Sequence, residues 1–210
     1  MGRISQRTRE KTALAVFGLL LAVLLAAVVV ALAASSRSLN VTASNLNDAL
    51  GDLDGYTVIV YESPSASDDS TNETTLEEVA AAYEEKGASV LVLDLSDLSY
   101  YEEGLIILCG DVRIGVFCVD IYSLQREIRA QVEYFMSYDV DYIVAITPHT
   151  ALLRKVSGVD VVVSTRDDDP GTSGEVDDWT FYVSIPSEGS FGVVLISSTG
   201  TVSSKVITSL

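Results

Sequence analysis

The chain is poor in the residues and motifs on which many enzyme mechanisms depend. Its 210 residues include one histidine, His149, and two cysteines, Cys109 and Cys118. There is no G-x-S-x-G motif, no P-loop and no paired C-x-x-C motif. A Ser-His-Asp arrangement would need His149 beside a serine that no motif identifies. These absences exclude the common signatures of serine hydrolases, phosphate-binding loops and dithiol redox centres.

The two cysteines are not expected to form a disulfide. Gly110 and Asp111 are typical of a two-residue hairpin turn, which would pair Cys109 with Val112 on the facing strand. Cys118 then lies several residues farther along that strand, too far for a disulfide with Cys109. We therefore expect two buried thiols.

Basic residues are also scarce. The chain has 13 Lys and Arg against 30 Asp and Glu, a net charge of −17. This charge disfavours nucleic acid as a partner, because the phosphate backbone is itself negative. It suits solubility in high salt or attraction of cations, although a generally solvated acidic surface explains the same composition. Charge alone therefore assigns no metal site.

One long apolar segment is present, Ala13 to Ala34, without a charge or a strongly polar group. At ~1.5 Å per residue, a helix of this length spans the ~30 Å hydrocarbon core of a membrane. The basic residues that precede it outnumber the single acid, and they are Arg3, Arg7, Arg9 and Lys11. This excess predicts a single-pass anchor with residues 1–12 in the cytoplasm and the rest of the chain outside.

A cleaved signal peptide is the rival interpretation, because Ala31-Leu32-Ala33 matches an A-x-A cleavage site. The apolar run is longer than the usual ~7–15-residue signal core, which favours an uncleaved anchor. Both interpretations place the remaining chain outside the cytoplasm. Two glycosylation candidates, Asn40 and Asn72, agree with that location.

The segment 35–54 is polar and rich in small residues, and we expect a stalk there; a domain then follows over 55–210. The expected strands are 56–61, 89–93, 105–108, 113–119, 142–146, 159–163, 180–185, 191–197 and 202–208. Thr74-Thr75-Leu76-Glu77 matches a capping box that opens an amphipathic helix ending at Lys86-Gly87. A second helix shows one apolar face of Leu124, Ile128, Val132 and Phe135, and a short helix is expected within 150–156.

The alternation of strand, helix and strand predicts parallel pairing with right-handed crossovers. The last three strands are expected to finish the sheet in antiparallel order. The predicted fold class is therefore α/β: a single domain with a mixed, largely parallel sheet flanked by helices and antiparallel C-terminal strands, plus one N-terminal transmembrane helix.

The order of these pieces resembles the calcineurin-like metallophosphoesterases, and most closely the catalytic domain of bacterial 5′-nucleotidases. The stretches that carry the resemblance are EKGASVLVLD (85–94), GDVRIGVF (110–117), DVDYIVAITPH (139–149) and GVDVVV (158–163). The similarity covers roughly Tyr56 to Leu210, an estimate from element order. It implies two metal ions at the carboxyl ends of the strands, which Asp, His and Asn side chains would hold. The metal ions would polarise the phosphate and generate a hydroxide nucleophile.

Most of the ligand motifs that the resemblance implies are missing. The Asp-x-His motif falls on Ser63-Pro64-Ser65, and Gly-His-x-His falls on 164–168, which contains no histidine. The Gly-Asn-His-Glu motif and its helix have no room between Asp97 and Leu105. This pattern is typical of a degenerate member of the family.

Three residues remain as metal-ligand candidates: Asp97, His149 and Asp168. Asp97 matches the family's bridging carboxylate, but a turn residue or helix cap explains it as well. His149 follows a strand as a family ligand does, although a lone loop histidine is commonly polar surface. Asp168 lies in an acidic loop that is typical of a solvated cluster, or of an oxygen-type site for Ca²⁺ or Mg²⁺.

Three hypotheses about function follow. The leading one is a membrane-anchored, extracytoplasmic, non-catalytic phosphoesterase-like domain without a cofactor, which serves as a binding or structural subunit for a protein partner or as a homo-oligomer. The second is a hydrolase that uses a divalent metal in a remodelled site of Asp94, Asp97, His149, Asp167 and Asp168. The third is an acidic cell-surface assembly component.

Overall fold

The computed structural model describes residues 52–63, 74–166, 174–177 and 179–208. These residues belong to one compact unit, Leu39–Leu210. The expected anchor at 13–34, the sequons at Asn40 and Asn72, and the acidic residues Asp167 and Asp168 lie outside the described residues. Within the described ranges, no helix has the length and apolar character needed to cross a membrane.

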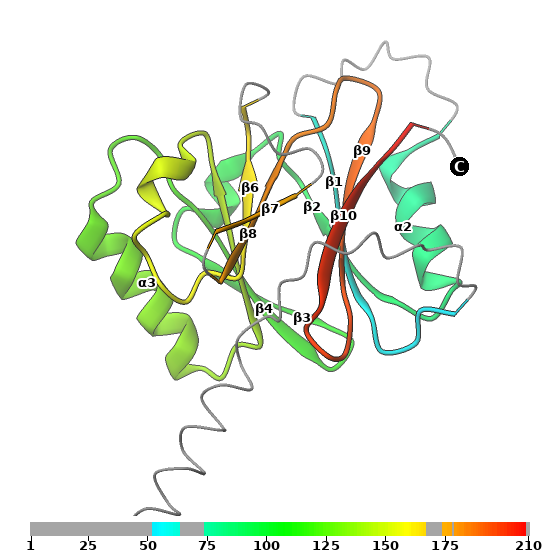
Figure 1. Ribbon diagram of the computed structural model, residues 1–210, viewed down its shortest axis with the longest axis horizontal. Helices are drawn as coiled ribbons and strands as arrows, with labels where there is room; N and C mark the ends of the chain where they lie inside the picture. Colours follow the sequence, from blue (N-terminus) through cyan, green and yellow to red (C-terminus); the bar gives the residue numbers. More distant parts are fainter. Residues whose placement is uncertain (1–51, 64–73, 167–173, 178, 209–210) are drawn as a thin grey trace, which may run out of the picture. The chain divides into compact units, whose positions relative to one another are not determined.

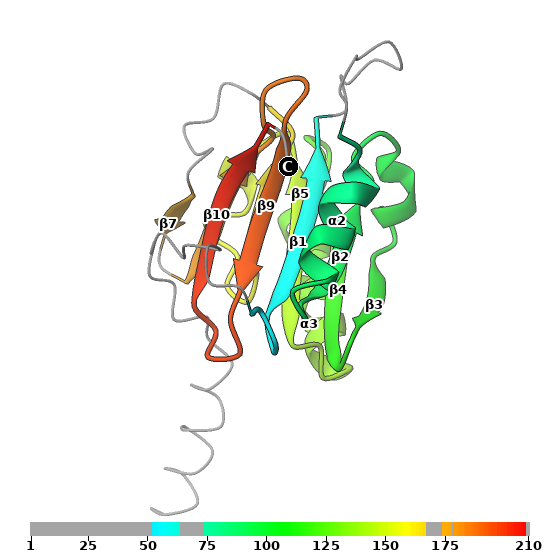
Figure 2. The ribbon, with the colours of Figure 1, turned by 90° about the vertical axis from the view of Figure 1, so that its right-hand side faces the viewer.

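The described chain forms two sheets packed face to face, with one helix on the outer face of each (Figures 1 and 2). The smaller sheet has the order β10-β9-β1-β2, with β1 Thr57–Glu62, β2 Ser89–Leu93, β9 Phe191–Ile196 and β10 Val202–Ile207. The larger has the order β3-β4-β5-β6-β8-β7, with β3 Leu105–Cys109, β4 Val112–Cys118, β5 Tyr142–Thr147, β6 Val161–Ser164, β7 Glu175–Asp177 and β8 Thr180–Ser184. A single α/β domain is confirmed, but the prediction of one sheet is wrong.

The division into two sheets arises because the chain returns at its end to its first strand. β9 pairs antiparallel with β1, from Thr57 opposite Ile196 to Glu62 opposite Phe191. β9 therefore joins β1 rather than extending the sheet beyond β8. A strand's own pattern does not specify its neighbour, so the division of the strands into two sheets could not be predicted from the sequence.

Parallel pairing forms the centre of the larger sheet, whereas the smaller sheet has one parallel pair and two antiparallel pairs. β1 lies parallel to β2, and β4, β5, β6 and β8 lie parallel in that order. The antiparallel β9–β10 hairpin is confirmed. The expectation that β8 begins an antiparallel finish is wrong, because β8 pairs parallel with β6 and antiparallel only with the short strand β7, which was not predicted.

Two helices cover the outer faces, α2 Leu76–Glu84 on the smaller sheet and α3 Gln125–Ser137 on the larger (Figure 1). The capping box of α2 lies one residue later than predicted. Thr75 Oγ1 accepts from the Glu78 N–H at 3.2 Å, and the Glu78 carboxylate accepts from the Thr75 N–H at 2.9 Å. The helix expected within 150–156 is only the 3-10 turn η2, Thr150–Leu152.

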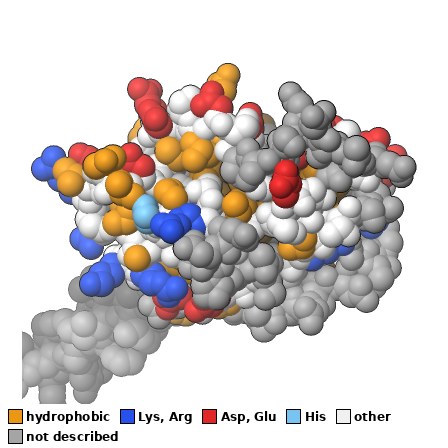
Figure 3. Space-filling view, turned by 90° about the horizontal axis from the view of Figure 1, so that it is seen from above, with side chains coloured by type: hydrophobic (Ala, Val, Ile, Leu, Met, Phe, Trp, Pro, Cys, Tyr) orange, Lys and Arg blue, Asp and Glu red, His pale blue; other side chains and the backbone are white. Residues whose placement is uncertain are grey.

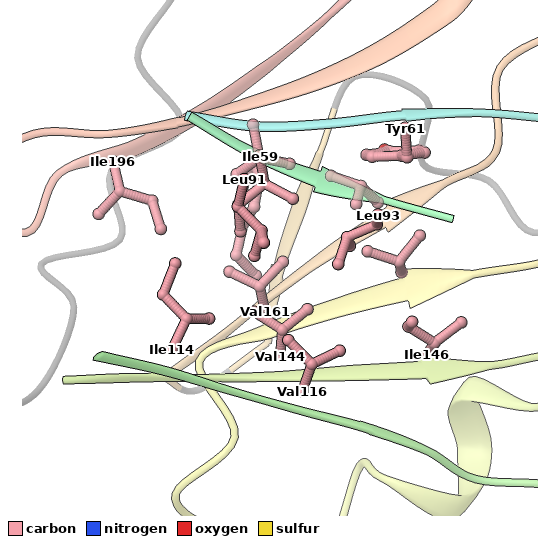
Figure 4. Packing of buried hydrophobic residues seen from close by; sticks show 14 of the residues in the cluster. Ile59, Tyr61, Leu91, Leu93, Ile114, Val116, Val144, Ile146, Val161 and Ile196 are labelled. Atoms are coloured by element: carbon pink, nitrogen blue, oxygen red, sulfur yellow. The ribbon is translucent and has the colours of Figure 1, made fainter. Parts of the chain in front are cut away.

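The principal core lies between the two sheets, and Figure 4 shows its branched aliphatic side chains interleaving. Ile59 and Leu91 from the smaller sheet meet Val144 and Val161 from the larger. Full burial of each such side chain contributes about 1.5–3 kcal/mol. Two outer cores lie under α2 and α3, and Leu53, at the end of the expected stalk, is buried in the first of them.

The predicted hairpin between β3 and β4 is confirmed, with Cys109 opposite Val112. Gly110 has φ +61°, which a glycine adopts without strain at the first central position of a type II′ turn. Cys109 is buried, Cys118 is half-buried, and both thiols are free. Burial raises the pKa of each thiol.

Candidate functional site

The strands of both sheets that run parallel end at the same edge of the molecule. In Figure 4 the labelled residues near the ends of β1, β2 and β5, which are Tyr61, Leu93 and Ile146, lie together at one end of the core. The loops that follow β2, β4 and β5, residues 94–104, 119–124 and 148–153, form what we call the strand-end surface. Parallel strands conventionally place binding residues at this edge.

Buried hydroxyl groups occupy the strand ends. They belong to Ser63, Thr147, Ser164 and Ser184. Thr147 Oγ1 accepts from the His149 N–H at 3.0 Å, and Ser164 Oγ accepts from the Arg166 N–H at 3.4 Å. These two hydroxyls thus satisfy the backbone of the loop that follows each strand, which fixes the path of that loop.

Tyr61 closes the space between the two sheets at this edge. Its side chain is buried, its ring packs over Gly192 of β9, and its hydroxyl donates to the Ser184 carbonyl of β8 at 3.2 Å. A Cβ on Gly192 would overlap this ring, so the glycine makes room for the tyrosine. Burial raises the pKa of Tyr61, which keeps the hydroxyl protonated as a donor. The strand ends are therefore filled by a hydrogen-bonded aromatic side chain.

The carboxylates of the strand-end surface are exposed and hydrogen-bonded within their own loops. Asp94 accepts from the Ser96 N–H at 2.9 Å and the Ser96 hydroxyl at 2.5 Å, and these bonds lower the pKa of Asp94. Asp97 accepts from the N–H and hydroxyl of Ser99, at 3.0 and 2.6 Å, and caps the 3-10 turn η1, Leu98–Tyr101. Asp120 also accepts from residues two and three positions later. Asp97 thus serves as the helix cap that the sequence analysis weighed against a ligand role.

His149 is half-buried and lies immediately before the turn η2, whose first backbone bond runs from the Leu152 N–H to the His149 carbonyl at 3.0 Å. It follows β5 of the larger sheet, whereas Asp97 follows β2 of the smaller one. Across the described part of the chain, no group of three or more His, Cys, Asp and Glu side chains could hold a metal ion. Asp168, the third predicted ligand, lies beyond the described residues.

Glu62 is a carboxylate at this edge that the sequence analysis missed. It is the last residue of β1, half-buried, and directly precedes the position of the expected Asp-x-His motif. Burial raises its pKa first, and the negative charges of Glu77 and Asp94 raise it further. Its position at the end of the strand 56–61 was the available signal. Glu62 therefore gives this edge a carboxylate that is protonated more readily than usual.

The strand-end surface exposes apolar and aromatic side chains beside its carboxylates. Tyr122 is 81% exposed, Tyr100 67%, Ile121 54% and Leu124 48%. Figure 3, seen from above, shows hydrophobic side chains gathered around the histidine, with basic side chains beside it. The helical pattern placed Leu124 on the buried face of α3, but Leu124 is the residue before the helix and is exposed.

Comparison with known proteins finds a distant structural likeness. No family model matches the chain, and no curated protein matches it. Among solved structures, the chain is similar to a 5′-nucleotidase precursor from Thermus thermophilus, with 12% identity and a TM-score of 0.40. The match covers 62% of this chain and 35% of that one, so the chain spans about a third of its length. A likeness of this size carries no argument about activity.

Proposed function

We propose that this protein is a membrane-anchored, extracytoplasmic binding domain that does not catalyse phosphoester hydrolysis. One observation carries the proposal: the strand ends bury their hydroxyl groups and Tyr61, while the strand-end surface exposes apolar and aromatic side chains at 100, 121, 122 and 124. Such a surface suits a macromolecular partner or a second copy better than a charged phosphoester. The apolar segment Ala13 to Ala34 supports the membrane anchor in this proposal.

The carboxylates support the same conclusion. Asp97 accepts both hydrogen bonds from Ser99 with Oδ1, and Asp94 accepts both from Ser96 with Oδ1, so one oxygen of each carboxylate is already engaged within its own loop. Hydrogen bonds to charged groups contribute about 1.5–3 kcal/mol each, so they oppose binding of a metal by both oxygens of either carboxylate. Asp94 and Asp97 thus stabilise the loops that contain them.

The exposed side chains are of the types that contribute most to protein interfaces. Tyrosine offers a large contact area with few rotatable bonds, and Tyr100 and Tyr122 both present it. An anchor would confine the domain to two dimensions and raise its effective concentration towards partners in the same membrane. Modest affinity at this surface would then suffice for assembly.

Metal binding and hydrolysis test the non-catalytic part of the proposal. The full-length protein in mild detergent is titrated with Mn²⁺, Zn²⁺ and Mg²⁺ by calorimetry and assayed with a generic phosphodiester and a nucleotide. We expect neither tight binding nor turnover. Tight binding together with turnover that is lost in Asp97→Ala, but kept in the control Asp111→Ala at the far end of the sheet, would show that the protein is a hydrolase.

Association tests the binding part. The mass of the full-length protein is measured by light scattering in mild detergent, together with any protein that co-purifies. We expect a complex that the double variant Ile121→Ser/Tyr122→Ser weakens and that Tyr138→Ser, at the C-cap of α3, leaves intact. A monomer without a co-purifying partner would contradict the binding role.

A further inference from the structure

A second concave site lies on the outer face of the larger sheet, and of the strand-end surface only Leu153 takes part in it. It is a pocket of about 240 Å³ between the segment 153–158 and the strands β7 and β8. The residues that matter here are Arg154, Asp177, Trp179 and Tyr182, and we call this site the Trp179 pocket. Tyr182 belongs to the core on the α3 side of the sheet, which places the pocket on that face.

A donor and an acceptor are held side by side in the pocket. Arg154 Nη1 lies 2.8 Å from Asp177 Oδ2, and the guanidinium lies 5.3 Å from the centroid of the Tyr182 ring. The two charged side chains remain 43% and 39% exposed, so both are accessible to a ligand. A guanidinium carries five N–H donors and a carboxylate about four acceptor sites, so their pairing leaves capacity on each. The pocket therefore offers both kinds of hydrogen bond at one place.

An aromatic surface completes the pocket. Trp179 lines it and is 66% exposed, and it is the one tryptophan in the chain. Tryptophan is highly buried on average, so a tryptophan this exposed beside a pocket is a feature to explain. Its ring offers a flat apolar face for contact with the apolar side of a ligand.

We propose that the Trp179 pocket binds a pyranose ring of a saccharide. A pyranose has an apolar C–H face that suits an indole, and its hydroxyls both donate and accept hydrogen bonds, as the paired Asp177 and Arg154 require. An anionic ligand would meet the Asp177 carboxylate, and a cation would meet Arg154 and Lys155, so a ligand of either sign would have a like charge beside it. A wholly apolar ligand would desolvate the ion pair without replacing its water contacts. A neutral polyhydroxylated ring is the chemistry that satisfies all four side chains.

The volume limits the ligand to one ring. Pockets for drug-sized ligands occupy about 300–1,000 Å³, and this pocket is smaller. The remainder of a longer saccharide would extend into solvent past the exposed Trp179. This proposal is independent of the binding role proposed for the strand-end surface, so either can fail without the other.

Because Trp179 is the single tryptophan, its fluorescence reports on this pocket alone. The full-length protein, in a detergent without a sugar headgroup, is titrated with methyl glucoside, methyl galactoside, methyl mannoside and N-acetylglucosamine. We expect at least one to change the emission saturably, with a Kd in the millimolar range, roughly as for weak single-ring contacts. The same sugar should protect Trp179 from quenching by acrylamide.

Variants identify the groups responsible. The double variant Arg154→Gln/Asp177→Asn keeps the net charge of the pair and should weaken binding by about tenfold or more, the loss expected for strong hydrogen bonds. Trp179→Phe is measured by calorimetry and should also weaken binding. Tyr138→Ser, which alters another exposed aromatic residue, should leave the affinity unchanged.

Three results would overturn the proposal. They are the absence of any saturable change with all four sugars up to roughly tenfold above the millimolar range, undiminished affinity in the folded double variant, and binding of inorganic phosphate in place of the sugars. If the double variant does not fold, the acrylamide experiment on the natural protein decides alone, because a bound ring must shield Trp179.

Discussion

The two ends of the strands use their carboxylates in opposite ways. At the carboxyl ends, Asp94 and Asp97 accept hydrogen bonds from serines two residues later in the same loop. At the amino ends, Asp160 accepts from the Ile143 N–H at 2.7 Å, and Asp141 accepts from the Arg113 N–H at 2.8 Å, each joining neighbouring strands. The amino ends thus hold the larger sheet together, whereas the loops at the carboxyl ends are organised locally and leave their outer surface for contacts.

Substitution of Tyr61 tests how much the side chains at the carboxyl ends of the strands contribute to the core. We expect it to have the largest effect on stability. Tyr61→Ala should lower the free energy of unfolding by about 3–5 kcal/mol, because it leaves a cavity between the sheets. Tyr61→Phe should cost about 1 kcal/mol, since it loses only the bond to the Ser184 carbonyl. Urea unfolding measures both. Equal costs for the two variants would show that the ring contributes little.

The pH dependence of stability tests the role of Asp160 at the amino ends of the strands. Burial raises the pKa of its carboxyl to about 7, against the opposing effect of the Ile143 N–H. Between the unfolded pKa near 4 and this value the folded state binds the extra proton, so stability should fall as pH rises from about 4 to 7 and then level off. Asp160→Asn should flatten this dependence and raise Tm at pH 8 by a few degrees, for about 1 kcal/mol.

The control for Asp160 is Asp141→Asn, which alters the neighbouring amino-end carboxylate on an exposed residue. Thermal unfolding of both variants is followed over that pH range. The assignment to Asp160 is wrong if Asp141→Asn flattens the profile as much as Asp160→Asn does.

Substitution of Asp97 tests how much its capping hydrogen bonds stabilise the loop after β2. Asp97→Ala should cost about 1 kcal/mol of stability, as for loss of an N-cap, because it frees the Ser99 N–H. Asp97→Asn keeps an acceptor and should cost less. Denaturant midpoints compare them, and an Asp97→Ala variant as stable as the natural protein would contradict the capping role.

Substitution of an exposed aromatic residue of the strand-end surface should have the smallest effect on stability. Tyr122 is 81% exposed, and Tyr122→Ser should change the free energy of unfolding by no more than about 0.5 kcal/mol. The same change should nonetheless weaken association in the experiment proposed above. A large loss of stability in urea would mean that Tyr122 belongs to the fold rather than to a contact surface.

Local patterns predicted the elements well where short-range spacing was decisive. The spacing of Ile128, Val132 and Phe135 predicted α3, and all three are buried under it. Gly110 predicted the β3–β4 turn, because its neighbours read as strands and glycine accepts a positive φ. The capping box was misplaced by one residue, since Thr74 and Thr75 are both suitable caps and the sequence does not distinguish them.

Contacts between distant segments could not be predicted in this way. The pairing of β9 with β1, the parallel neighbour of β8, and the burial of Leu53 all depend on which surfaces meet after the helices have packed. The role of the Asp160 carboxylate has the same origin, because its partner Ile143 lies on the preceding strand. In sequence, Asp160 was simply one residue of an apolar strand stretch.

The sequence by itself determined the type of most elements, the separation of the two free thiols across a hairpin, and the presence of only one histidine, because each follows from residue identity and short-range spacing. Only the tertiary structure decided that the strands form two sheets, that Tyr61 reaches from one to the other, and that Arg154 meets Asp177 beside Trp179. The physical reason is that side chains far apart in the chain come together only when layers pack, and packing depends on all the faces at once.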